Sequence, residues 1–146
     1  MKIIGRKDIV DFPSFGLKHV PVKIDTGAYS CSIHCTSVKH VKTADSDYLE
    51  VVFLDSGMRG YTGEIQRFIN FHTKIVKSSN GVAEERFFVE GNVVLFGESI
   101  ETLFSLTERS GLRNPVLLGR RLLNKRFLVD TSKTKCSFKA ASRELN

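Results

Sequence analysis

The residues best placed to do chemistry are Asp25-Thr26-Gly27-Ala28, which directly follow a run that alternates apolar and polar side chains. Val20, Val22 and Ile24 take alternate positions in that run, which predicts a strand with one buried face. A carboxylate at the end of a buried strand, followed by small residues, is typical of a group held rigidly at a cleft. Asp also begins ordinary turns, so a purely structural Asp25 stays an alternative.

Amide hydrolysis by carboxylates needs two acids that share one proton. One accepts a proton from water while the other donates to the carbonyl oxygen, and their crowding separates the two pKa values. Asp55 lies in a similar Asp-Ser-Gly tripeptide, but the thirty residues after Asp25 are too few to build a second lobe. We interpret Asp55, and likewise Asp130 of Asp-Thr-Ser, as structural turns. The second carboxylate is therefore expected from the Asp25 of a second copy, in a two-fold homodimer.

A second motif follows about ninety residues later, where Asn114 to Leu123 reads NPVLLGRRLL. These residues predict a turn, a short apolar strand, Gly119 and then a short helix over 120–125. An Asp-Thr-Gly-Ala strand followed at this distance by an apolar-apolar-Gly-Arg strand resembles the retroviral-type aspartic proteases, the retropepsins. The resemblance implies a flap over the cleft, which has room between Tyr48 and Val89, although its tip cannot be placed.

Three longer segments extend the resemblance to a bacterial family labelled ATP-dependent zinc proteases and associated with RimK-type ligases. The segments are KIDTGAYSCSIH from Lys23, VKSSNGVAEERFFV from Val76 and LLGRRLLNKRFLVD from Leu117. Together with the opening at Ile3–Arg6, they cover nearly the whole chain. This similarity implies a retropepsin-like fold, despite the zinc and ATP in the label.

By matching position, the resemblance implies that Asp25 is the catalytic acid and base, with one in each subunit. It also implies that Thr26 hydrogen-bonds across the dimer, that Gly27 lines the substrate backbone and that Ala28 supports the same loop. Tyr29-Ser30 stand where the retroviral enzymes commonly have acidic residues. Substrate anchoring is therefore expected to differ from theirs.

Three further site residues are implied by the same resemblance. Gly119 is expected to pack near the catalytic loop, and Arg120 to open the helix and tie it to that loop. His34 matches a histidine of the bacterial family, and both a role near the active site and a purely structural role stay open.

Zinc binding is an alternative raised by the cluster of Cys31, His34 and Cys35, because thiolates and imidazoles are the ligands that zinc prefers. The His-Glu-x-x-His and Cys-x-x-Cys signatures are missing, as is a phosphate-binding glycine loop for ATP. Buried cysteines also commonly act as small apolar fillers. We therefore predict no metal and no cofactor, and keep a zinc-dependent hydrolase as an alternative.

The chain has 146 residues, 41% of them hydrophobic, which fits one domain over residues 1–146. Short strand-like runs between turns predict an all-β class, as a closed barrel with one short C-terminal helix. The Asn80-Gly81 pair predicts a hairpin. The runs are Lys2–Ile4, Val20–Ile24, Tyr48–Leu54, Arg67–Val76, Glu85–Val89, Val93–Phe96, Leu103–Leu106, Val116–Leu118, Phe127–Val129 and Lys135–Phe138.

Composition bounds the location and the partners. There is no run of about 18 apolar residues that would span a membrane, and the charged start does not resemble a secretory signal. An odd count of three cysteines indicates a reducing cytosol. The net charge is +6, yet the basic residues are scattered and lack interleaved aromatics, so nucleic acid is not an expected partner.

One group of cations suits an acidic partner. It comprises Arg113, Arg120, Arg121 and Arg126, which would suit a glutamate-rich tail added by a RimK-type ligase. The leading interpretation is a cytoplasmic, homodimeric, retropepsin-like aspartic endopeptidase. A catalytically inactive domain of the same fold, which binds an extended peptide as an added strand, is the second.

Overall fold

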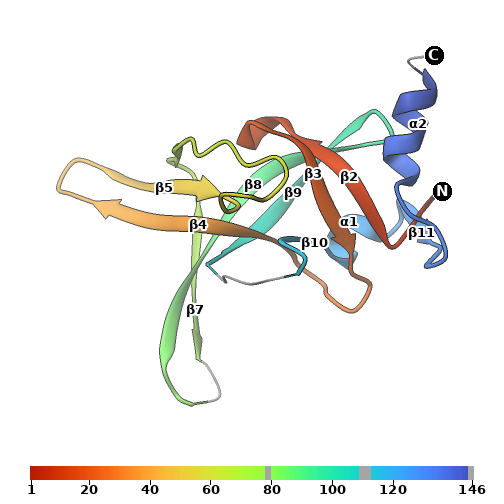
Figure 1. Cartoon of the computed structure of the whole chain (residues 1–146). Helices are drawn as coiled ribbons and strands as arrows, with labels where there is room; N and C mark the ends of the chain where they lie inside the picture. Colours follow the sequence, from red (N-terminus) through yellow and green to blue (C-terminus); the bar gives the residue numbers. More distant parts are fainter. Residues whose placement is uncertain (78–79, 109–112, 145–146) are drawn as a thin grey trace.

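The computed structural model describes residues 1–77, 80–108 and 113–144, and strands make up most of them (Figure 1). The first five strands are β1 (Lys2–Ile4), β2 (Lys7–Phe12), β3 (Leu17–Ile24), β4 (Cys31–Lys42) and β5 (Asp47–Phe53). The others are β6 (Gln66–Phe68), β7 (His72–Lys77), β8 (Ala83–Leu95), β9 (Glu98–Thr107), β10 (Val116–Leu118) and β11 (Phe127–Val129). The helices are α1 (Arg120–Leu123), α2 (Cys136–Glu144) and a single 3-10 turn at Pro13–Phe15.

The sheet closes into a barrel. Its hydrogen-bonded order runs β10-β3-β2-β8-β9-β4, and β4 pairs again with β10. β5 and β6 extend outward from β4, and β7 pairs with β8 outside the ring. This confirms the predicted all-β class and the predicted closed barrel.

Aromatic side chains fill the barrel. Phe12, Phe15 and Phe104 are fully buried, and the Phe15 ring stacks on Phe53 with centroids 4.3 Å apart. A Cβ at Gly91 would lie 2.3 Å from the Phe15 ring, so β8 passes this ring only because it has glycine there. These large contacts anchor the barrel that carries the candidate site.

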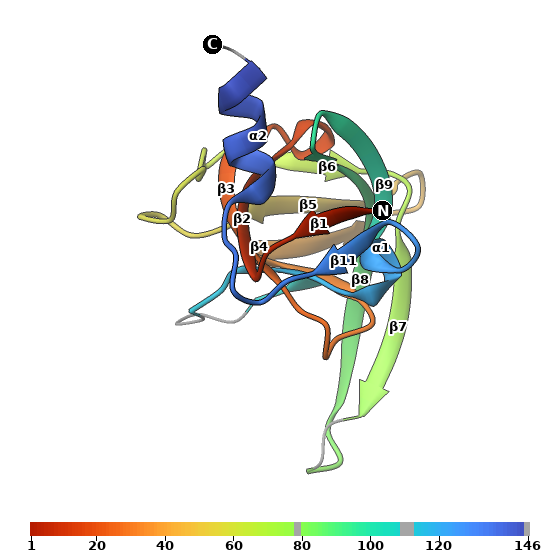
Figure 2. The same cartoon turned by 90° about the vertical axis from the view of Figure 1, so that its right-hand side faces the viewer.

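A long hairpin of β7 and β8 leaves the barrel and extends on the same side as the loop between β3 and β4 (Figures 1 and 2). Its register runs from His72 opposite Phe88 to Lys77 opposite Ala83. The predicted Asn80-Gly81 hairpin is confirmed, although Ser78-Ser79 of its turn lie outside the described residues. This hairpin lies within the stretch where we expected the flap.

The prediction of a strand at Lys135–Phe138, and with it the prediction of one short helix, is wrong. These residues begin α2 instead, because the buried carboxylate of Asp8 accepts hydrogen bonds from the backbone N–H groups of Ser137 and Phe138. An acceptor at these positions satisfies donors that a helix start leaves free. The helix predicted over 120–125 is present as α1 and ends two residues earlier.

No helix within the described ranges is both long enough and apolar enough to cross a membrane.

Candidate active site

β3 delivers Asp25 to the end of a strand that is paired on both sides. β10 runs parallel to it, with Leu118 opposite Ile24, and β2 runs antiparallel on its other edge. The Asp25 backbone N–H donates to the Leu118 carbonyl at 2.9 Å. The position of this carboxylate is therefore set by three strands of the barrel.

The Asp25 side chain is half-buried and closes a tight turn. Its Oδ1 accepts a hydrogen bond from the Gly27 backbone N–H at 3.0 Å, and the Ala28 N–H donates to the Asp25 carbonyl at 3.3 Å. Oδ1 therefore stabilises a turn, as the structural alternative expects, and this role occupies only one of the two carboxylate oxygens. Among the described residues, Oδ2 has no hydrogen-bond partner, and Thr26 and Gly27 are exposed.

Gly119 lies directly against this loop. A Cβ at Gly119 would lie 2.5 Å from the carbonyl oxygen of Ser30, 2.7 Å from that of Tyr29 and 2.8 Å from that of Ala28. Its backbone N–H also points to the buried Cys31 Sγ at 3.4 Å. Glycine is required here because the backbone following β10 crosses the loop at van der Waals distance.

Arg120 fastens the same loop through backbone and side chain. Its N–H donates to the Ala28 carbonyl at 2.8 Å, and its guanidinium Nη1 donates to the Thr26 carbonyl at 2.8 Å. The guanidinium also lies 6.0 Å from the centre of the Tyr29 ring. The structure therefore brings Asp25, its three following residues, Gly119 and Arg120 together, as the sequence analysis expected.

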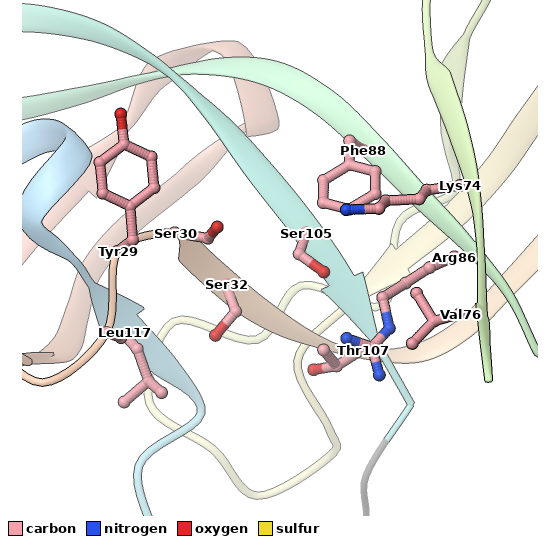
Figure 3. Close-up of a pocket in the computed structure, with 11 residues that line it drawn as sticks. Tyr29, Ser30, Ser32, Lys74, Val76, Arg86, Phe88, Ser105, Thr107 and Leu117 are labelled. Carbon is pink, nitrogen blue, oxygen red and sulfur yellow. The ribbon is translucent and has the colours of Figure 1, made fainter. Parts of the chain in front are cut away.

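A cavity of about 400 Å³ opens between this loop and the β7–β8 hairpin (Figure 3). Its polar lining comes from hydroxyl groups of the barrel and from two cations that extend from the hairpin toward them. The lining residues are Ala28, Tyr29, Ser30, Ser32, Lys74, Val76, Arg86, Phe88, Ser105, Thr107 and Leu117.

The two cations of this cavity, Lys74 and Arg86, are directly opposite in the β7–β8 register. Like charges at opposed positions destabilise a strand pair, and none of the residues that line the cavity is acidic. Figure 3 shows both side chains extending from the hairpin toward Ser105 and Thr107. This arrangement suits a bound anion, which would remove the repulsion.

Sequence analysis did not identify this cation pair. To recognise the pair, one must know the β7–β8 register and the pairing of β9 with β8, which together bring residues about thirty positions apart to one cavity. The available signal was the position of Lys74 and Arg86 on either side of the Asn80-Gly81 hairpin, but it does not show which face of the hairpin meets the loop.

His34 lies elsewhere, in a buried contact with the loop after β5. Its Nε2 is 2.8 Å from Asp55 Oδ2, and Thr36 Oγ1 donates to Asp55 Oδ1 at 2.9 Å. The hydrogen bonds from His34 and Thr36 lower the pKa of Asp55. Asp55 also accepts the Met58 N–H, in the turn that the sequence predicted. His34 therefore pairs with Asp55 and does not line the cavity beside Asp25 that is described above.

The zinc alternative does not fit these residues. Cys31 and Cys35 are fully buried, and burial raises the pKa of both thiols, which opposes the thiolate that zinc needs. Within the described ranges, no three His, Cys, Asp or Glu side chains are grouped so that they could hold a metal ion.

The four arginines expected to act together are divided by β10. Arg113 precedes this strand and lines a separate cavity, whereas Arg120 follows it and bonds to Thr26. Arg126 Nη1 donates to the Leu122 carbonyl at 3.1 Å.

Asp130 forms the predicted turn, in which its Oδ1 accepts hydrogen bonds from the backbone N–H and the hydroxyl group of Ser132.

Comparison with known proteins assigns the whole arrangement to one family. A model of RimB-like proteins, described as "Retropepsin-like aspartic endopeptidase RimB", matches residues 3–140. Two curated relatives are each named "Probable alpha-L-glutamate ligase". The protein from Shewanella pealeana is 27% identical in an alignment of 139 residues, and the match covers 92% of this chain and 29% of that protein. The protein from Desulfotalea psychrophila is 26% identical in an alignment of 145 residues, and the match covers 98% of this chain and 31% of that protein.

This chain thus spans less than a third of the length of the curated relatives it matches. A crystal structure of a Legionella pneumophila protein of unknown function is 21% identical to it, with a TM-score of 0.61. The match covers 93% of this chain and 98% of that chain. At this identity the likeness is one of fold.

Proposed function

The chain belongs to the RimB-like family of retropepsin-like aspartic endopeptidases, and from this premise we propose that two copies of it form a peptide-bond hydrolase with one Asp25 from each. One domain over residues 1–146 would supply half of the site. The observation that carries the proposal is the fixed position of Asp25 at the end of β3, locked by Gly119 and Arg120.

Catalysis would use the two Asp25 carboxylates as one unit with a shared proton. One accepts a proton from the attacking water, the other donates to the carbonyl oxygen, and no covalent intermediate forms. The Gly27 N–H holds Oδ1, which leaves Oδ2 for the partner and the water. The exposed Thr26 is available to hydrogen-bond across the dimer, and the exposed Gly27 to line the substrate backbone.

For substrate class, we propose acidic protein tails, including those that a RimK-type ligase extends. The support is the opposed pair of Lys74 and Arg86 in a cavity without acids beside the catalytic loop. Tyr29-Ser30 add no negative charge to the same cavity. The curated relatives, named as glutamate ligases, point to the same chemistry.

We place this activity in the cytosol. Cys31, Cys35 and Cys136 are all free thiols, and such cysteines persist in a reducing compartment.

Peptide-library cleavage by the wild-type protein and Asp25→Asn tests the hydrolase, scanned from about pH 4 to 8 with and without a chelator. We expect cleavage that the substitution abolishes and the chelator leaves intact. Cleavage that survives Asp25→Asn would contradict the proposal. If neither protein cleaves but both bind peptide, the inactive binding domain becomes the better account.

The substrate class has its own test in the same assay. Lys74→Glu/Arg86→Glu is expected to lower kcat/KM for glutamate-rich peptides about tenfold or more, while matched glutamine peptides are cleaved no worse. Lys39→Glu/Lys42→Glu is the control, because it changes the net charge equally on the exposed β4–β5 hairpin. An equal effect of both double variants would exclude a local role for the cation pair.

A further inference from the structure

A second group of cations lines a cavity that shares no residue with the cavity beside Asp25. This cavity of about 380 Å³ contains Lys7, Arg59, Arg113 and Lys135. The four come from β2, the loop after β5, the segment before β10 and the segment before α2. In Figure 2 these segments gather on the left of the barrel, whereas the β7–β8 hairpin descends on the right.

The positive lining continues into a neighbouring cavity of about 490 Å³, which contains Lys133, Lys139 and Arg143. Thr134 lines both cavities, so they adjoin. We call the combined surface the basic face; its cations are Lys7, Arg59, Arg113, Lys133, Lys135, Lys139 and Arg143.

Acidic side chains offset little of the charge of the basic face. Of its cations, Lys133 acts on Asp130, whose pKa is lowered by the hydrogen bonds from Ser132 and, to a smaller extent, by the Lys133 charge. Among the described residues, Asp8 is the one acid that lines either cavity. It is 2% exposed, and its oxygens accept hydrogen bonds from the N–H groups of Ile9, Ser137 and Phe138. No ion pair in the described part of the chain involves a cation of the basic face.

The backbone holds Lys7 and Lys135 of the basic face close together, since the Lys135 N–H donates to the Lys7 carbonyl at 2.8 Å. Lys7 also lies opposite Lys23 in the β2–β3 register, although Lys23 lines neither cavity. Like charges at opposed positions are unfavourable without an anion between them. An anionic partner would convert this repulsion into binding free energy.

We propose that the basic face is an exosite that binds an acidic stretch of the polypeptide substrate, away from the bond that is cut. Two adjoining cavities spread the charge over a surface, which suits an extended acidic chain better than one small anion. None of the described residues that line either cavity is aromatic, so this part of the face lacks the stacking platforms of single-strand nucleic-acid sites. The choice of an acidic chain rests on the substrate class proposed above.

The test is fluorescence anisotropy with a labelled glutamate-rich peptide of about 15 residues, which spans about 50 Å when extended. The protein carries Asp25→Asn so that the peptide stays intact. We expect Arg59→Glu/Arg113→Glu to weaken binding about tenfold and Arg59→Gln/Arg113→Gln about threefold. Lys39→Glu/Lys42→Glu, matched in charge, is expected to change it less than about twofold. Urea unfolding midpoints establish that each variant is folded.

Kinetics with Asp25 intact separate the exosite from the cleft. Arg59→Gln/Arg113→Gln is expected to raise KM for the long peptide and leave cleavage of a peptide of about six residues unchanged. Equal weakening by both charge-reversal variants would overturn the exosite, as would a duplex RNA that binds the same arginines more tightly than the peptide. Persistent cleavage by Asp25→Asn would instead overturn the hydrolase, and the anisotropy result would stand by itself.

Discussion

Gly119→Ala is the substitution for which the structure predicts the sharpest effect on the site. The new Cβ would lie within 2.8 Å of three carbonyl oxygens, those of Ala28, Tyr29 and Ser30. None of them is the end of a flexible side chain, so either the loop after Asp25 or the start of α1 must move.

The magnitude follows from what that movement breaks. Overpacking of a well-packed site costs about 1–3 kcal/mol. The hydrogen bonds from Arg120 N–H to Ala28 and from Arg121 N–H to Tyr29 span the same contact, and each contributes about 1 kcal/mol. We expect a loss of about 3 kcal/mol in the free energy of unfolding, which lowers the Tm of a chain of this length by about 10 °C.

Urea unfolding and peptide cleavage at a temperature where the variant is folded measure the two consequences separately. Gly57→Ala is the control, since it meets no atom within 4 Å and costs only the strain of a positive φ. We expect that control to lose about 1 kcal/mol and keep its activity. Gly119→Ala that is as stable and as active as Gly57→Ala would refute the close crossing at this loop.

Two further predictions concern groups outside the cleft. The hydrogen bonds from His34 and Thr36 hold the pKa of Asp55 below its unfolded value of about 3.9. They therefore stabilise the folded state fully above that pH, and this stabilisation is lost as the pH falls through the folded pKa. Urea midpoints should therefore show Asp55→Asn less stable at pH 7, with the difference shrinking below about pH 4; a gap that is independent of pH would contradict this pairing. Iodoacetamide should label the half-buried Cys136 of the native protein first, because burial raises the pKa of the Cys31 thiol, and early labelling of Cys31 would exclude the buried position.

Local sequence signals were sufficient for β3 and β10, the parallel pair that positions Asp25, but the predicted runs left out β2 and β4, which pair with them. The alternation of Val20, Val22 and Ile24 gave the correct strand, and the short apolar run at Val116–Leu118 was placed without error. The close packing of Gly119 against the loop was expected from the resemblance to the retropepsins, whose apolar-apolar-Gly-Arg motif these residues match. The two strands depend on the order of apolar and polar residues next to one another in the sequence, so a local pattern can predict them.

Three other failures came from contacts between distant residues. The pattern of Lys135–Phe138 predicts a strand, but these residues begin a helix. The start of this helix is capped by Asp8, which lies 129 residues before Ser137 in the sequence. β8 was predicted as two runs because Gly91 interrupts its apolar pattern, and the Phe15 ring explains that glycine. The cations beside Asp25 depend on the β7–β8 register, which no local pattern specifies.

The central claim is that each active site needs Asp25 from two chains, and mixing experiments test it most directly. Wild-type protein at fixed concentration is incubated with increasing Asp25→Asn until subunits have exchanged, and peptide cleavage is then measured; Asp45→Asn, which alters an exposed aspartate near the tip of the β4–β5 hairpin, is the control. At equal amounts, random pairing leaves about half of the wild-type chains with a wild-type partner, so activity should fall to about half. Activity that is unaffected by Asp25→Asn, and proportional to wild-type concentration at every dilution, would show that one chain cleaves alone.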